Sequence, residues 1–228
     1  MKPIIGIIGK VRKSEDNTTM ISSVEDIRRV VIRKGGIPFL ILPTQDIDYE
    51  NDKSKLTEEE IKDIKVIVDL CDGIIIPGGC VLYDYDKVIY EYAIEKDIPV
   101  IGICAGMQLI AINDKNEEEE KVLDKIESNI EHQSPDADYV HSVNIKKGTH
   151  LYDIIGKETI NVNSRHSYKV KSVNSLAISA ISEDGIIEGI ERTDKKFVIG
   201  IQWHPENMCT YDEDANKIFD RFMEACFK

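Results

Sequence analysis

The sequence has 228 residues, of which 42% are hydrophobic and 31% are charged, so the chain is able to bury a sizeable core under a charged surface. Asp and Glu outnumber Lys and Arg by 42 to 29, which gives a formal net charge of −13. Nucleic acids and anionic membrane surfaces bind basic patches, so an acidic balance excludes both from the expected partners.

The N-terminal residues 1–13 contain only a short apolar run and no small-residue cleavage site. This pattern predicts neither a signal peptide nor a membrane span, so we expect a cytoplasmic protein. The five cysteines are an odd number and form no CxxC pair. In a reducing compartment they are interpreted as free thiols and not as a disulfide framework.

Strand and helix patterns alternate along the first half of the chain. Continuous apolar runs predict buried strands over 3–9, 37–43, 73–79 and 98–104. Amphipathic patterns predict helices over 22–36, 57–73 and 85–97, the first with a serine cap and the second with a capping box of Thr57 and Glu60. Such alternation is typical of a parallel sheet with helices on both faces.

The second half of the chain changes character. An acidic stretch after Asn113 predicts an exposed loop or helix start. Short strand-like runs over 139–201, which end in "FVIGIQW", are interpreted as antiparallel additions to the sheet, and a helix is expected over 212–227. With no repeat and no linker, residues 1–228 are predicted to form one α/β domain with a mostly parallel central sheet.

The segment 102–106, "GICAG", is the clearest chemical signal in the sequence. It has the G-x-nucleophile-x-G form of a nucleophile elbow, in which a strained strand-to-helix turn lifts a reactive side chain above the sheet edge. The positive end of the following helix favours the thiolate of Cys104. A buried cysteine on a packed turn is the alternative for this motif taken alone.

Two further segments favour the catalytic interpretation. The strand-ending "IIIPGG" over 74–79 offers glycine N–H groups, and Gly79 with Ala105 is a candidate pair of oxyanion donors. An ordinary Pro-Gly turn is the alternative there. The segment "GIQWHPEN" over 200–207 presents His204 as a candidate base and Glu206 as the carboxylate that orients it.

The order of PGG, GICAGMQ and QWHPE resembles the class I glutamine amidotransferase superfamily over essentially the whole chain. Within it, "TINVNSRHSYKV" (159–170) and "YVHSVNI" (139–145) resemble segments of the γ-glutamyl-γ-aminobutyrate hydrolase group, with His166 and His141 on the matching histidines. The resemblance implies a flavodoxin-like, doubly wound fold. It also implies hydrolysis of a γ-glutamyl amide by Cys104, His204 and Glu206 through a thioester.

Several positions depart from that group's pattern. The group usually has arginine where this chain has Ala105, an aspartate soon after PGG where this chain reads "PGGCVLYDY", and glutamine where this chain has Tyr168. It usually has a glycine-rich turn where this chain reads "AINDKNEEEE". We therefore expect the substrate to be held elsewhere, with Gln108, Arg165 and His166 as the candidate contacts.

The resemblance implies no metal and no organic cofactor. A soft metal bound by Cys80, Cys104, His204 and Cys209 is an alternative, although their spacing fits no standard zinc pattern. The motifs are also compatible with a glutaminase subunit that supplies ammonia to a partner chain, and with a binding protein that kept the triad without catalysis. A chaperone or glyoxalase-like relative is disfavoured by the distant His-Pro-Glu. A homodimer is left open.

Overall fold

The computed structural model describes residues 1–227, which contain a mixed sheet of nine strands in the order β10-β9-β13-β14-β15-β6-β5-β1-β4. Five neighbouring strands are parallel: β4 (Ile37–Ile41), β1 (Ile4–Ile8), β5 (Gly73–Ile76), β6 (Val100–Ile103) and β15 (Val198–Ile201). The others pair antiparallel: β14 (Ile187–Glu191), β13 (Ala177–Ser182), β9 (His141–Ile145) and β10 (Thr159–Val162).

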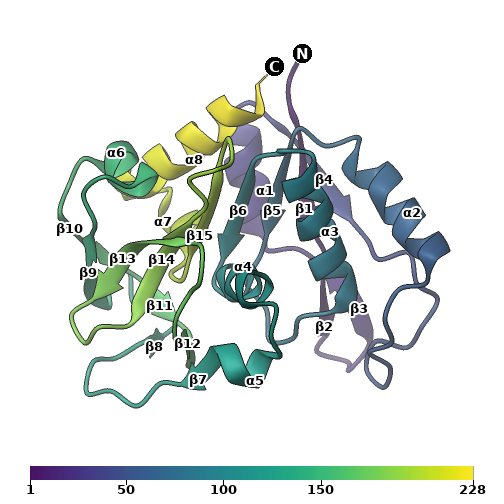
Figure 1. Cartoon of the computed structure of the whole chain (residues 1–228), viewed down its shortest axis with the longest axis horizontal. Helices are drawn as coiled ribbons and strands as arrows, with labels where there is room; N and C mark the ends of the chain where they lie inside the picture. Colours follow the sequence, from purple (N-terminus) through teal and green to yellow (C-terminus); the bar gives the residue numbers. More distant parts are fainter. Residues whose placement is uncertain (228) are drawn as a thin grey trace.

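Helices cover both faces of this sheet (Figure 1). Buried side chains on one face come from α1 (Glu25–Arg33), α6 (His150–Ile155), α7 (Pro205–Met208) and α8 (Glu213–Cys226). On the other face they come from α2 (Glu58–Val68), α3 (Asp84–Glu95), α4 (Ala105–Lys115) and α5 (Glu119–Val122). Because both faces are covered, the parallel strands are almost continuously apolar.

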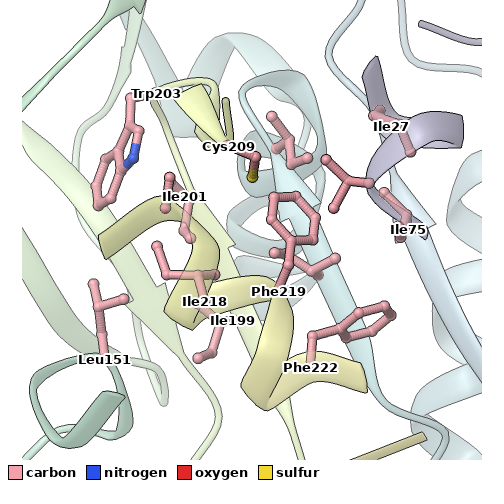
Figure 2. Packing of buried hydrophobic residues seen from close by; sticks show 14 of the residues in the cluster. Ile27, Ile75, Leu151, Ile199, Ile201, Trp203, Cys209, Ile218, Phe219 and Phe222 are labelled. Carbon is pink, nitrogen blue, oxygen red and sulfur yellow. The ribbon is translucent and has the colours of Figure 1, made fainter. Parts of the chain in front are cut away.

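The core under α8 shows how the C-terminal half is attached to the parallel sheet. Figure 2 shows Phe219 and Phe222 of α8 above the sheet, with Ile75 of β5 and Ile199 of β15 among their neighbours. The indole of Trp203, two residues after the end of β15, is buried in the same cluster. Burying side chains of this size contributes roughly 1.5–3 kcal/mol each. The strand that leads to the candidate base therefore has a fixed position in the core.

Three two-stranded sheets lie along one edge of the main sheet, at the bottom of the view in Figure 1. They pair β2 (Lys10–Lys13) with β3 (Thr19–Ser22), β7 (Leu123–Lys125) with β12 (Tyr168–Val170), and β8 (Gln133–Ser134) with β11 (Ser164–Arg165). Strand β1 runs down to this edge from the N-terminus, so this is the carboxyl edge of the parallel strands.

Most of the elements predicted from the sequence are confirmed, including the capping box of Thr57 and Glu60 at α2. The acidic stretch after Asn113 is exposed and contains the short helix α5. The predicted serine cap of α1 is wrong, because Val24 occupies the N-cap position and makes no side-chain cap bond. None of the helices within residues 1–227 is both long and apolar enough to cross a membrane.

The assignment of residues 197–203 to the antiparallel strands is wrong in part. Strand β15 pairs antiparallel with β14 but parallel with β6, with Ile201 opposite Ile103. Both strands therefore end at the same edge. The residues that follow them, Cys104 and His204, are brought together by this pairing.

Candidate active site

Cys104 occupies the turn between β6 and α4, where its backbone angles are φ 53° and ψ −107°. A positive φ is rare for a residue with a Cβ and costs of order 1–3 kcal/mol, so it persists only where the surroundings enforce it. Here the N–H of Cys104 donates to the carbonyl of Ile201 at 2.7 Å, and its carbonyl accepts from Gln108 at 3.1 Å. The sheet and the helix together hold the strained turn.

The glycines on either side of Cys104 are required by close packing. A Cβ on Gly106 would lie 2.2 Å from the carbonyl oxygen of Ile76 in β5, and one on Gly102 would lie 2.7 Å from the backbone of Gly106. Real Cβ atoms do not approach backbone atoms so closely, so neither position tolerates a larger residue without a shift of the chain. The G-x-C-x-G pattern is therefore explained by the crossing of strand and helix, as expected for a nucleophile elbow.

His204 lies beside Cys104 at the end of β15 and is the N-cap residue of α7, with Pro205 at the first helical position. Its Nδ1 lies 2.8 Å from Oε1 of Glu206, whose side chain is buried. A Cβ on Gly78 would meet His204 Cε1 at 3.0 Å and Cys104 Cβ at 3.3 Å, so both side chains flank the PGG turn. The structure thus places the imidazole of His204 between the Cys104 sulfur and the Glu206 carboxylate, as expected for a candidate triad.

The protonation of His204 follows from its two partners. Burial lowers the pKa of this imidazole, but Glu206 and the hydrogen-bonded Cys104 sulfur outweigh burial and raise the pKa to about 10. The imidazolium therefore lies between the Glu206 carboxylate and the Cys104 sulfur. The arrangement is suited to nucleophilic attack followed by proton donation.

Asn163 holds the backbone of His204, a role that the sequence did not indicate. Its Oδ1 accepts from the N–H of His204 at 2.8 Å, and its Nδ2 donates to the His204 carbonyl at 2.9 Å. The residue is 1% exposed, so these bonds do not compete with bulk water. Asn163 belongs to the "VNSRH" segment, but no local pattern shows that it lies against a residue 41 positions away.

A cavity of about 910 Å³ opens onto the triad, and Cys104, His204, Glu206, Gly78 and Gly79 are among its lining residues. Its other walls carry more cations than carboxylates although the chain is acidic: Lys10, Arg12, Lys13, Lys53 and Arg165 against Glu50.

Three of these cations are already partnered. Lys10 pairs with the buried Asp86 at 2.7 Å, Lys13 pairs with Glu50, and Arg165 donates to Oδ1 of Asn207 at 2.9 Å. Arg12 and Lys53 make no ion pair or side-chain hydrogen bond to any of residues 1–227. The cavity therefore offers unneutralised positive charge to a ligand.

The candidate substrate contacts separate into two groups. Arg165 lines the cavity. Gln108 and His166 are not among its lining residues, which is a correction to the expected set. The Gln108 amide instead lies 3.3 Å from the Tyr168 carbonyl and 3.3 Å from Gln202 Oε1, and His166 is buried beside Glu188. Both residues are buried.

The four cysteines other than Cys104 differ in their exposure. Burial raises the pKa of Cys71, Cys209 and Cys226 to about 12 each, so these three are poor nucleophiles near neutral pH. Cys80 is exposed and lines the cavity. Among residues 1–227 no set of three or more candidate metal ligands includes Cys80, Cys104, His204 or Cys209, so the geometry gives no support to a soft metal site there.

The fold and site define an α/β protein of the nucleophile-elbow class, with a cysteine, a histidine and a glutamate at the carboxyl edge of the sheet. The Peptidase C26 family model matches residues 83–206, a segment that contains Cys104, His204 and Glu206. The chain belongs to the Peptidase C26 family, among the class I glutamine amidotransferase-like proteins.

Similar proteins agree with this placement. The glutamine amidotransferase-like protein RP404 of Rickettsia prowazekii is 30% identical over 273 residues, which cover 90% of this chain and 91% of that protein. CTP synthase of Staphylococcus aureus is 29% identical over 260 residues, which cover all of this chain but only 45% of the synthase.

Two solved structures show the same fold at low sequence identity. The glutaminase domain of Trypanosoma brucei CTPS, with bound acivicin, has a TM-score of 0.65 at 19% identity, over 99% of this chain and 94% of that one. A glutamine amidotransferase from Methylobacillus flagellatus has a TM-score of 0.66 at 12% identity, over 99% and 95% of the two chains.

Proposed function

We propose that this protein hydrolyses a γ-glutamyl amide bond and releases glutamate through a γ-glutamyl thioester on Cys104. The observation that carries the proposal is the contact between the Cys104 sulfur and the imidazole of His204, whose Nδ1 is held 2.8 Å from Glu206 Oε1 beside a cavity of about 910 Å³. The family membership supports a hydrolase of this general kind.

In the acylation step, the Cys104 thiolate attacks the γ-carbonyl carbon and forms a C–S bond. The negative charge that develops on the carbonyl oxygen is stabilised by the N–H groups of Gly79 and Ala105. Ala105 is the first residue of α4, so its N–H has no partner within the helix. The amide C–N bond then breaks, and His204 donates its Nε2 proton to the departing amine.

In the deacylation step, neutral His204 takes a proton from water, and the resulting hydroxide equivalent attacks the thioester carbonyl. The C–S bond breaks, glutamate is released, and the thiolate–imidazolium pair is restored. Glu206, whose Oε1 lies 2.8 Å from His204 Nδ1, stabilises the imidazolium. No metal or organic cofactor enters this sequence of steps.

The charges of the cavity support a substrate with more than one carboxylate. A γ-glutamyl group carries one α-carboxylate, and a leaving amine that is itself an amino acid carries another. Arg165, Arg12 and Lys53 line the same cavity as Cys104, and the last two have no counter-ion among residues 1–227. Guanidinium groups bind carboxylates in a bidentate manner, so Arg12 and Arg165 are the candidates to take the place of the arginine that the resembled group has at the position of Ala105. γ-Glutamyl-γ-aminobutyrate is one substrate of this description.

A second candidate function is a glutaminase that supplies ammonia to a partner. The similarity to CTP synthase favours it, since the chain spans 45% of that protein's length and matches the fold of a CTPS glutaminase domain. In that case glutamine hydrolysis depends on a partner chain. A stand-alone hydrolase needs none.

A hydrolysis panel distinguishes the two functions. The purified chain is incubated with glutamine, γ-glutamyl-γ-aminobutyrate and γ-glutamyl peptides, and glutamate release is followed with Cys104→Ala as the blank. We expect the doubly charged γ-glutamyl substrates to exceed glutamine at least tenfold in kcat/KM. Hydrolysis of glutamine but of no other member would overturn the choice of substrate, and no hydrolysis of any member by the chain alone would overturn the stand-alone function in favour of the partner-dependent glutaminase.

A further inference from the structure

Three histidines and one glutamate form a second polar cluster, away from the triad. His132 precedes β8, His141 is the first residue of β9, His166 lies between β11 and β12, and Glu188 lies in β14. Their side chains lie together in the interior, and the four residues are 3%, 7%, 4% and 0% exposed. We call these four residues the histidine cluster. One ligand atom from each lies within 4.8 Å of all the others.

The atoms that face the centre of the histidine cluster have no hydrogen-bond partner among residues 1–227. They are His132 Nδ1, His141 Nε2, His166 Nε2 and both carboxylate oxygens of Glu188. The three nitrogens lie 3.4, 3.8 and 3.4 Å from Glu188 Oε1, respectively. Leaving a buried polar atom unpaired costs about 1–3 kcal/mol, so five such atoms at one place require an explanation.

The outer nitrogen of each ring meets an oxygen that accepts a hydrogen bond. His132 Nε2 lies 3.1 Å from Asp184 Oδ2, His141 Nδ1 lies 3.2 Å from the Ser142 carbonyl, and His166 Nδ1 lies 3.0 Å from the Tyr168 carbonyl. An oxygen acceptor fixes the ring proton on the outer nitrogen. The inner nitrogen of each neutral ring then carries a lone pair that points at the other ligands. Metal-binding histidines are oriented in this way.

The distances from the three nitrogens to Glu188 Oε1 are close to those around a tetrahedral ion. Bonds of about 2.0–2.1 Å to a central zinc place neighbouring ligand atoms about 3.3–3.4 Å apart, as tetrahedral geometry requires. Two of the three measured N···O distances are 3.4 Å and the third is 3.8 Å. Three neutral imidazoles and the Glu188 carboxylate carry one negative charge, and the Asp184 carboxylate, 3.1 Å from His132 Nε2, adds a second, so together they balance a divalent cation.

We propose that the histidine cluster binds one divalent transition-metal ion, with Zn²⁺ as the best match, through His132, His141, His166 and Glu188. Four protein ligands complete a tetrahedron and leave no open position, so the ion is structural and not catalytic. No sequence motif marks the site, because its ligands come from four separate elements with no short spacing between any two of them. The site is distinct from the triad and does not depend on the proposed function.

The bound ion would support the triad through one segment of the chain. The backbone N–H of His166 and the hydroxyl of Ser164 both donate to the His132 carbonyl, at 2.9 and 2.7 Å. Asn163, the residue before Ser164, holds the backbone of His204 in the triad. Arg165 of the same segment lines the cavity beside the triad. A cavity of about 330 Å³, lined in part by His132 and His166, lies next to the histidine cluster.

The competing state of the cluster is a proton in place of the metal. Burial lowers the pKa of His132, but Glu188 and Asp184 outweigh burial and raise it, whereas burial lowers the pKa of His141. An imidazolium at His132 would donate to Glu188 and satisfy part of the cluster without any ion. Experiment separates the two states, because only one of them binds metal in a stoichiometric manner.

The test uses the full chain, stripped with a chelator and dialysed into metal-free buffer. Zn²⁺ or Co²⁺ alone is then titrated in, and the bound metal is counted by elemental analysis. We expect one equivalent per chain, a visible Co²⁺ spectrum of the tetrahedral type without a thiolate charge-transfer band, and a rise in Tm of about 5–10 °C at saturation. No stoichiometric binding and no rise in Tm would overturn the proposal in favour of the protonated cluster.

Variants locate the bound ion. Glu188→Gln and His141→Gln should each lower the affinity at least a hundredfold, whereas His150→Gln, which changes a histidine outside the cluster, should keep it. Cys104→Ser should also keep the affinity and the spectrum. Two cluster variants are used so that a folding defect in one of them leaves the other as a test. Binding that survives both cluster variants but is lost in Cys104→Ser would place the ion on the catalytic thiol and overturn the assignment.

Discussion

The candidate triad and the histidine cluster both place histidine beside glutamate, but the surroundings of the two groups are opposite. In the triad, Glu206 pairs with His204, His204 pairs with Cys104, and the cavity of about 910 Å³ leads to all three. In the histidine cluster, the outer atoms are paired, the inner atoms are not, and every side chain is buried. Paired groups beside a cavity are suited to moving protons, whereas converging unpaired groups in a closed site are suited to holding a cation.

The largest effect on the triad side is expected from Cys104→Ala. Without the sulfur no thioester forms, so kcat/KM should fall by about a thousandfold or more, since what remains is binding and the oxyanion donors. Steady-state glutamate release with the best substrate of the panel measures it. The metal-dependent rise in Tm should be unchanged in this variant. Residual activity above a few per cent would contradict the thioester mechanism, and a lost Tm response would contradict the separation of the two groups.

His204→Ala should be the next most severe change, and Glu206→Gln should be about tenfold milder. The first removes the proton carrier, whereas the second weakens only the stabilisation of the imidazolium. Both variants are compared by kcat/KM at one pH. Equal losses, or the reverse order, would show that the roles of the two residues are assigned wrongly.

The pH profile sharpens the same assignment. His204 must be protonated to donate to the leaving amine, so activity should be lost as the pH rises through its pKa of about 10. Glu206 raises that pKa, and Glu206→Gln should therefore move the alkaline limb of kcat/KM to lower pH. A limb that stays in place would mean that another group controls it.

Asn163→Ala tests the link between the triad and the segment that carries His166. Loss of two hydrogen bonds to the His204 backbone should misplace the imidazole and lower kcat by about tenfold to a hundredfold. Asn161→Ala, an exposed neighbour in β10, is the matched control. The alkylation rate of Cys104, followed by mass spectrometry of its peptide, should fall in the first variant only. Equal alkylation in both would limit Asn163 to a role in folding.

The smallest catalytic effect is expected from Arg165→Ala, which removes one cation from the cavity wall. KM for a γ-glutamyl substrate should rise several-fold, because a surface-accessible carboxylate contact contributes only about 1 kcal/mol. Arg29→Ala, an exposed residue of α1, serves as the control. Cys104 should be alkylated at its normal rate. An unchanged KM would remove Arg165 from the substrate site, and slower alkylation would mean that it acts on the thiol.

The sequence by itself determined most of the strands and helices and the identity of the candidate triad. Apolar runs that end in glycine specify buried strands, and G-x-C-x-G specifies a tight crossing because a Cβ on Gly106 would lie 2.2 Å from the carbonyl of Ile76. Such signals are local, so they are readable without a fold. His204 was found in the same way, from a histidine and a glutamate directly after a strand.

Only the tertiary structure decided what these residues meet. The parallel pairing of β15 with β6 sets His204 beside Cys104, and no local pattern distinguishes that pairing from an antiparallel one. The same holds for His166. The sequence predicted that this residue contacts the substrate, whereas in the structure its imidazole lies beside Glu188. His166 lies between β11 and β12, and these two short strands pair with β8 and β7. The direction of its side chain therefore depends on contacts with segments far away in the chain. The histidine cluster exists only because four such segments converge on one buried point.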